Sequence, residues 1–227
     1  MLQAIIFDFD GLILDTESLL YQAWADVCRS LGVTLSRHVW LSYVGTRNAF
    51  LRYDDLEKEL GRPIDREAVQ TDYENRTEVL LAAEPIRPGI LSYLKEAEQR
   101  GLKTGIASNS DRSWVTGHLQ RLGLTPYFPH VACGNEVSNP KPAPDVYQGI
   151  MEVLGVQPHS AIALEDSPPG VESAKAAGLF TVAVPNPLTK EMDLSAADIV
   201  VDSLATFTLD MAVQQYLTLG SRAADRN

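Results

Sequence analysis

Two aspartates directly after a short apolar run are the first residues of this 227-residue chain that could do chemistry. The run, Ala4 to Phe7, is typical of a buried strand of a parallel sheet, and Asp8, Asp10 and Gly11 follow it. Carboxylates two residues apart share one side of a continuing strand, and on a tight turn they can converge on one ion. Acids after a strand are also common turn formers, so this pair alone leaves a solvated loop open.

A second apolar run ends on the same type of residue. Residues 161–164 lead into Glu165 and Asp166, and Ser167 then begins a predicted helix. Adjacent ionised carboxylates repel each other, and a nearby cation would relieve that repulsion. The pair can therefore ligate a metal, or it can serve only to cap the helix that follows.

Polar residues also precede two further predicted helices. Ser108 and Asn109 follow a β-rich run, and a helix amino end with a hydroxyl beside it can bind an anion. Lys141 lies between two prolines at the start of a helix, where a cation opposes the helix dipole and needs an anionic partner. The alternatives are capping residues in the first case and a solvated loop lysine in the second.

The four sites together predict a metal and phosphate site. Capping preferences alone would not readily place two acidic pairs, a serine and a lysine at neighbouring ends of one sheet. A small number of oxygen ligands, with room for water and phosphate, favours Mg²⁺ over Ca²⁺ or Zn²⁺.

The elements that carry these residues predict an α/β fold, a doubly wound, Rossmann-like parallel sheet of about six strands with an inserted α-helical cap domain. The predicted strands are residues 4–7, 104–107, 131–133, 161–164, 181–184 and 199–201. The helices between them are predicted near residues 88–100, 111–122, 142–154 and 168–177.

The cap is predicted from a long helical stretch after the first strand. Leu20, Trp24, Val27 and Leu31 form one stripe of an amphipathic helix that Gly32 ends. Further cap helices are predicted at residues 37–44, 49–60 and 65–82. We expect a core domain of residues 1–14 and 86–213, a cap of residues 15–85 and a flexible tail of residues 214–227.

Composition and charge limit the function classes. The net charge of −11 and the isoelectric point near 4.8 argue against nucleic acid and anionic membranes as partners, since both need an electropositive face. The apolar runs are far shorter than the roughly 20 residues of a membrane span, so we expect a cytoplasmic protein, monomeric or weakly dimeric. Cys28 and Cys133 show no metal-ligand spacing and are expected to be free, buried thiols.

The segments "DFDG", "SNS", "KPAPD" and "LEDS", in this order and spacing, resemble the four motifs of the haloacid dehalogenase (HAD) superfamily. The resemblance is to its capped phosphatase and β-phosphoglucomutase-like branch and covers nearly the whole chain. It implies that Asp8 is the nucleophile, forming an aspartyl-phosphate, and that Asp10 is the general acid and base. It also implies that the Asp8 carboxylate and the Asp10 backbone carbonyl ligate Mg²⁺.

The same resemblance assigns the other motif residues. Asp166 would be the third protein ligand of the metal, and Glu165 either a ligand or an acceptor that orients water. Ser108 and Asn109 would hydrogen-bond the phosphoryl oxygens, and Lys141 would offset charge on both the phosphate and the nucleophile.

The function implied is a Mg²⁺-dependent phosphatase acting on a small phosphorylated metabolite, such as a sugar or polyol phosphate. A β-phosphoglucomutase-type mutase is the enzymatic alternative, but its cap histidine and lysine match Leu20 and Val44 here, which cannot replace them. A phosphate-accepting module without turnover is the non-enzymatic alternative. In the cap, Glu17 and Arg47 are the expected substrate contacts.

Overall fold

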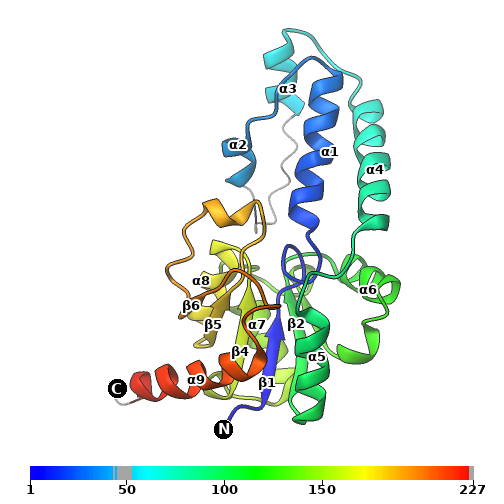
Figure 1. Cartoon of the computed structure of the whole chain (residues 1–227). Coiled ribbons are helices and arrows are strands. Elements are labelled where there is room, and N and C mark those ends of the chain that lie inside the picture. The colour runs from blue at the N-terminus through cyan, green and yellow to red at the C-terminus, as the bar shows by residue number, and fades with distance from the viewer. Residues whose placement is uncertain (43, 45–52, 225–227) are drawn as a thin grey trace.

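The computed structural model describes residues 1–42, 44 and 53–224 (Figure 1). Within them, six parallel strands form one sheet in the order β3-β2-β1-β4-β5-β6. The strands are β1 (Ala4–Phe7), β2 (Lys103–Ser108), β3 (Val131–Cys133), β4 (Ala161–Glu165), β5 (Phe180–Ala183) and β6 (Ile199–Val200). Every predicted strand is present within a residue or two of its expected bounds, which confirms the doubly wound sheet.

Helices bury both faces of the sheet. The helices are α5 (Ile90–Gln99), α6 (Arg112–Arg121), α7 (Asp145–Leu154), α8 (Pro168–Ala176) and α9 (Leu209–Ala224). Alternate residues of β1 enter two separate cores: Ile5 packs with α5, α6 and α9, and Ile6 packs with α7 and α8. Because both faces are covered, the strand sequence is continuously apolar rather than alternating.

The cap helices stand apart from the sheet, above its carboxyl edge in Figure 1. They are α1 (Thr16–Ser30), α2 (Arg37–Leu41), α3 (Tyr53–Leu60) and α4 (Arg66–Ala83). The predicted stripe on α1 is confirmed, since Trp24 and Val27 are buried in the cap core and Trp24 stacks on Tyr73 of α4 at 4.4 Å between ring centroids. Of the helix predicted at 49–60, residues 49–52 lie outside the described residues.

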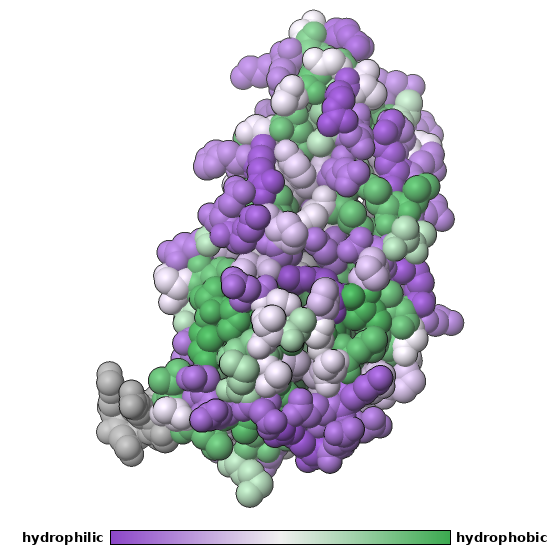
Figure 2. Space-filling view, in the orientation of Figure 1, coloured by the Kyte–Doolittle hydropathy of each residue, from purple (hydrophilic) through white to green (hydrophobic). Residues whose placement is uncertain are grey.

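The cap has a polar outer surface. Asp15 caps α1 by accepting a hydrogen bond from the Ser18 backbone N–H at 3.2 Å. Most residues of α4 are exposed, and on the face drawn in Figure 2 hydrophilic residues cover much of the cap. The cap core is therefore small and separate from the two cores of the sheet.

The flexible tail expected from residue 214 onward is not present as such, because α9 continues to Ala224. Leu209, Ala212 and Tyr216 are buried at helical spacing, and the Tyr216 ring meets Phe180 of β5 edge to face at 5.7 Å. Packing on the sheet stabilises this helix where local composition alone indicated fraying.

Two further sequence predictions concern the cysteines and the membrane. Cys28 and Cys133 are both free and buried, as expected. Among the helices of the described residues, none combines the length and apolar character that a bilayer span requires.

Candidate active site

Three carboxylates meet at the carboxyl edge of the sheet. Because β1 lies between β2 and β4, the residues that follow these strands are neighbours. The Asp8 backbone N–H donates to Leu164 O at 2.9 Å, which extends the pairing of β1 and β4 by one residue. Oxygens of Asp8, Glu165 and Asp166 all lie within 4.8 Å of one another, and all three residues are buried.

Lys141 is the cation of this cluster. Its ammonium group donates to Asp8 Oδ1 at 2.6 Å, to Glu165 Oε1 at 2.6 Å and to the Ala107 carbonyl at 2.8 Å. These contacts use all three of its N–H donors. Burial alone would lower the pKa of Lys141, but the Asp8 and Glu165 charges outweigh it and raise the pKa above its usual value. Lys141 therefore holds the carboxylate of Asp8, the predicted nucleophile, and offsets its charge.

Replacing Lys141 by methionine is expected to lower the free energy of unfolding at neutral pH by about 3–5 kcal/mol, because two buried carboxylates lose their partner. Urea unfolding measures this. Lys175→Met is the matched control: the Lys175–Asp198 ion pair is partly exposed, so its loss should change stability by less than about 1 kcal/mol. Similar losses in the two variants would contradict the role given to Lys141.

The donor set suits a divalent cation. Burial is the main cause that raises the pKa of both Asp8 and Asp166 well above the usual value, and the neighbouring carboxylates add to it. Lys141 opposes the shift at Asp8, and Arg87 opposes it at Asp166. A group of buried oxygen donors with excess negative charge is what Mg²⁺ binds in proteins. The residues present thus fit the metal that the sequence predicts.

Glu165 is held by three donors. Oε1 accepts from Lys141 and from the Tyr147 hydroxyl at 2.7 Å, and Oε2 accepts from the Asp166 backbone N–H at 3.1 Å. A Cβ atom at Gly170 of α8 would lie 1.9 Å from Oε2, so this position accepts only glycine while the carboxylate is there. Glu165 is therefore fixed in place and orients Lys141.

Asp166 is oriented by Asn186, which follows β5. The Asn186 side-chain oxygen accepts from the Leu188 and Thr189 backbone N–H groups at 2.8 and 2.9 Å, so its amide nitrogen must face the other way. That nitrogen donates to Asp166 Oδ2 at 2.7 Å. Gly11, at φ +80°, lets the first loop approach the same oxygen, since a Cβ there would lie 2.1 Å from it.

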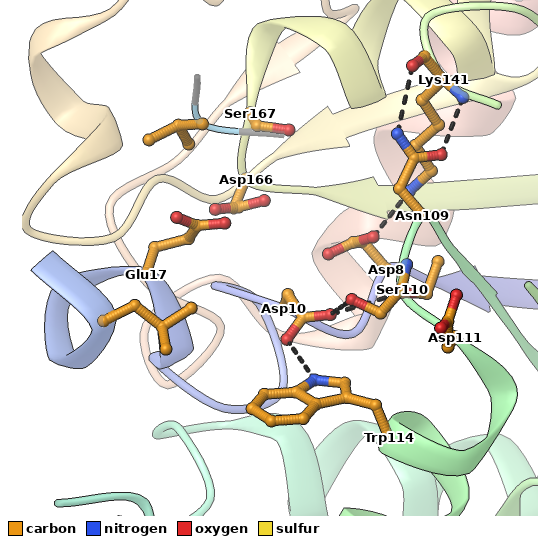
Figure 3. A pocket seen from close by; sticks show the side chains of 13 residues that line it. Asp8, Asp10, Glu17, Asn109, Ser110, Asp111, Trp114, Lys141, Asp166 and Ser167 are labelled. Carbon is orange, nitrogen blue, oxygen red and sulfur yellow. Dashed lines mark hydrogen bonds and ion pairs between the residues drawn. The ribbon is translucent and has the colours of Figure 1, made fainter. Parts of the chain in front are cut away.

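The Asp10 side chain turns away from these carboxylates and toward α6 (Figure 3). Oδ1 accepts from the Trp114 indole N–H at 2.9 Å. Oδ2 accepts from the Ser110 hydroxyl at 2.6 Å and, more weakly, from the Ser108 hydroxyl at 3.4 Å. The two aspartates of the first motif therefore have different surroundings, as different roles require.

Asn109 lines the pocket, and its side-chain amide pairs with the backbone of Lys141. Its amide oxygen accepts from the Lys141 backbone N–H at 2.7 Å, and its amide nitrogen donates to the Lys141 carbonyl at 3.1 Å (Figure 3). The amide thus fixes the backbone of Lys141, and the contact between Asn109 and a phosphoryl oxygen stays a prediction. Ser108, at the end of β2, is buried and lines the pocket, as its predicted role requires.

A pocket of about 290 Å³ opens above the cluster, between the sheet edge and the cap. Its lining residues are Asp8, Asp10, Glu17, Leu20, Val44, Ser108, Asn109, Ser110, Asp111, Trp114, Lys141, Asp166 and Ser167. Glu17, the first cap residue predicted to contact substrate, is among them; the second, Arg47, lies outside the described residues. A cavity of this size takes a small metabolite.

Residues 5–184 match the family model described as haloacid dehalogenase-like hydrolase. The chain belongs to this family. "Putative phosphatase YhcW" of Bacillus subtilis (strain 168) is 37% identical over 209 residues, which cover 92% of this chain and 95% of that protein. Hexitol phosphatase B of Escherichia coli (strain K12) is 32% identical over 212 residues, covering 90% and 94% of the two chains.

Solved structures agree with this HAD-like assignment. The crystal structure of β-phosphoglucomutase (pgmB) from Clostridium difficile superposes with a TM-score of 0.72 at 26% identity, covering 96% of this chain and 99% of that one. The predicted family and fold are thereby confirmed. Together with the phosphatases among its relatives, the match makes this HAD-like hydrolase an enzyme of the phosphatase type.

Sequence reasoning about this HAD-like hydrolase did not single out Asn186, Trp114 or Tyr147 as parts of the site. Asn186 follows a strand just as the motif residues do, so the strand-end rule could have found it. Trp114 lies in the first turn of the helix predicted after Ser108 and Asn109, close enough in the sequence to reach the same strand end. The sequence around Tyr147 gives no sign that this residue belongs to the site, because only the fold brings its hydroxyl to Glu165.

Proposed function

We propose that this hydrolase cleaves the phosphate monoester of a small sugar or polyol in a Mg²⁺-dependent reaction, with Asp8 accepting the phosphoryl group. The observation that carries the proposal is the ion pair between Asp8 and the buried Lys141 at the base of the pocket. A carboxylate held by a cation, beside two further carboxylates able to hold a metal, suits phosphoryl transfer, which depends on positioning and charge neutralisation.

Each step of the reaction has a residue in the pocket. An oxygen of Asp8 attacks phosphorus, the bond from phosphorus to the alcohol oxygen breaks, and Asp10 gives that oxygen a proton. Asp10 then takes a proton from water, the water oxygen attacks phosphorus, and Asp8 is released as the free carboxylate. Ser108 and the amino end of α6 supply hydrogen-bond donors for the phosphoryl oxygens.

The metal would be held by the Asp8 and Asp166 carboxylates, with the Asp10 backbone carbonyl as a third ligand. Mg²⁺ supplies positive charge against the phosphoryl oxygens when it is bound. Glu165 keeps Lys141 in place, and Asn186 keeps Asp166 in one orientation.

The substrate side of the pocket favours hydrolysis of a neutral polyhydroxy ester over a mutase reaction. Leu20 and Val44, which the sequence resemblance matches to the mutase histidine and lysine, line the pocket with apolar groups. Neither can bind a sugar hydroxyl or a second phosphate. Among the described cap residues that line the pocket, Glu17 is the polar one, and a hexitol phosphatase is among the relatives that match nearly the whole chain.

The test is a panel of phosphate monoesters incubated with the native protein and Mg²⁺, with released phosphate as the readout. A hexitol phosphate, a hexose 6-phosphate, a hexose 1-phosphate and a nucleoside monophosphate cover the ester classes. Continuous release from the sugar or polyol esters supports the proposal. Isomerisation of the hexose 1-phosphate without phosphate release would indicate a mutase, and stoichiometric protein phosphorylation without turnover would indicate a phosphate-accepting module.

Glu17 gives a pH-dependent prediction. Burial, with Asp10 and Asp15 nearby, raises the pKa of Glu17 to about 8, so its carboxyl is mostly protonated at neutral pH and ionises as the pH rises through that value. Ionisation adds negative charge beside the incoming phosphate. The KM of the native protein should therefore rise by about tenfold between pH 7 and pH 9, a difference of about 1.4 kcal/mol in binding.

Glu17→Gln removes this titration while keeping a similar shape, so its KM should stay within about twofold over the same range. The measurement is KM against pH for both proteins with one hexitol phosphate. Parallel profiles for the two proteins would mean that Glu17 does not face the bound substrate.

A further inference from the structure

The Asp10 carboxylate is held by two donors from one helix start. Trp114, in the first turn of α6, donates its indole N–H to Oδ1, and Ser110, just before that helix, donates its hydroxyl to Oδ2 (Figure 3). Both distances, 2.9 and 2.6 Å, are those of well-formed hydrogen bonds. The carboxylate is thereby fixed on the α6 side of the pocket.

The indole is itself held from behind. Its ring meets His118, one turn further along α6, edge to face at 4.5 Å between centroids. His118 in turn stacks on Phe9 at 6.1 Å between ring centroids. Phe9 is buried and stands between Asp8 and Asp10 in the sequence. The loop that carries Asp10 and the helix that carries Trp114 are thus joined at two points.

The two donors differ in what they can do. An indole N–H can only donate, whereas a serine hydroxyl can donate or accept. Oδ1 therefore stays an acceptor, and a proton carried by Asp10 has to be on Oδ2, where the Ser110 hydroxyl can turn to accept a hydrogen bond from it. The geometry selects one oxygen of the carboxyl group as the proton carrier.

We propose that Trp114 is a positioning residue for the general acid: its indole N–H fixes the Asp10 carboxyl so that Oδ2 delivers the proton to the leaving alcohol oxygen. The inference rests on the proposed phosphatase function, in which Asp10 is that acid. It adds a residue from outside the four motifs to the proton-transfer machinery.

The test uses Trp114→Phe, which keeps a ring against His118 but removes the N–H donor. The measured quantity is kcat/KM, which reports phosphoryl transfer to Asp8, on two esters that differ in their leaving group. A hexitol phosphate has a poor leaving group that needs the proton, and 2,4-dinitrophenyl phosphate has a good one that does not. We expect a fall of about 10- to 50-fold on the first and less than about threefold on the second, within the roughly 10²–10⁴ that general acids contribute.

Two further variants check the assignment. Ser110→Ala removes the shorter of the two hydrogen bonds to Oδ2 without touching the indole and should show the same preference for the activated ester, which keeps the test open if Trp114→Phe fails to fold. In an Asp10→Asn background, Trp114→Phe should cause no further loss on the hexitol phosphate, because the two residues act as one unit. Thr116→Ala, an exposed hydroxyl on α6, is the matched control and should change neither rate.

The outcomes separate the inference from the function on which it rests. Equal losses on the two esters, no loss on the hexitol phosphate, or an additional loss in the Asp10→Asn background would each overturn the role of Trp114 while leaving the phosphatase intact. A native protein that releases phosphate from neither ester would overturn the proposed function and the inference with it.

Discussion

Replacement of Asp8 by asparagine is expected to reduce kcat for phosphate release by at least about 10⁴-fold, because an amide cannot form the acyl phosphate through which the proposed reaction proceeds. The loss should not come from unfolding. Asparagine keeps the shape of the side chain and an oxygen that can accept from Lys141, and Glu165 remains the charged partner of that ammonium group. The measurement is steady-state phosphate release with a hexitol phosphate and Mg²⁺.

The control for this variant is Asp72→Asn, in an ion pair with Arg76 on the outer cap helix α4. It should retain native activity, since exposed ion pairs of this type contribute little. Thermal unfolding of both variants should stay close to that of the native protein. An Asp8→Asn protein with more than about a tenth of the native rate would contradict the nucleophilic role.

Removal of divalent metal is expected to reduce the rate of phosphate release by at least about 10³-fold, and added Mg²⁺ should restore it. Asp8, Glu165 and Asp166 bring three carboxylates together, and the single positive charge of Lys141 cannot offset all of them, which favours a bound divalent cation. Ca²⁺ should restore less activity, because it takes longer bonds and more ligands than Mg²⁺. The measurement is phosphate release after chelation and readdition of each ion.

Metal binding can also be measured independently of enzymatic activity, by its effect on thermal stability. Mg²⁺ should raise the melting temperature of the native protein, with a stabilisation of about 2.7 kcal/mol at a hundredfold excess over its Kd. Asp166→Asn should lose most of this shift, whereas Asp72→Asn should keep it. Full activity in the presence of chelator, or an equal shift in all three proteins, would contradict a metal site at this edge of the sheet.

Much of the fold could be predicted because its signals are local. The run from Ala4 to Phe7 is apolar at every position since Ile5 and Ile6 enter different cores, and this is the pattern of a central parallel strand. Helix α9 was missed because its stability comes from contacts made across the fold. Tyr216 packs on Phe180, and this contact cannot be predicted from the sequence near Tyr216.

In the candidate site, too, some residues could be predicted from local sequence signals and others depend on contacts across the fold. Asp8, Lys141 and Asp166 could be predicted because each stands beside a strand end or helix start with its own sequence signal. The side chains that orient them could not be predicted as readily. The Asn109 amide, for example, pairs with the Lys141 backbone, a contact that depends on how two loops meet.

Lys141 links the acidic residues at the ends of two neighbouring strands. Its ammonium group joins the acid after β1 to the acid at the end of β4, and Asn109 fixes its backbone. Lys141 is therefore held at its backbone by hydrogen bonds and at its ammonium group by two ion pairs. This explains how a chain with a net charge of −11 can gather several buried acids at one point and still fold.

The most direct test of phosphoryl transfer to the protein is chemical trapping. The Mg²⁺-loaded native protein would be mixed with its best ester, quenched in acid during turnover, reduced with borohydride and digested for mass spectrometry. An acyl phosphate at Asp8 is reduced to homoserine, so we predict homoserine at position 8 in the quenched native protein and unmodified aspartate in a sample without substrate. Phosphate release at the native rate with only aspartate at position 8 in every quenched sample would contradict the account.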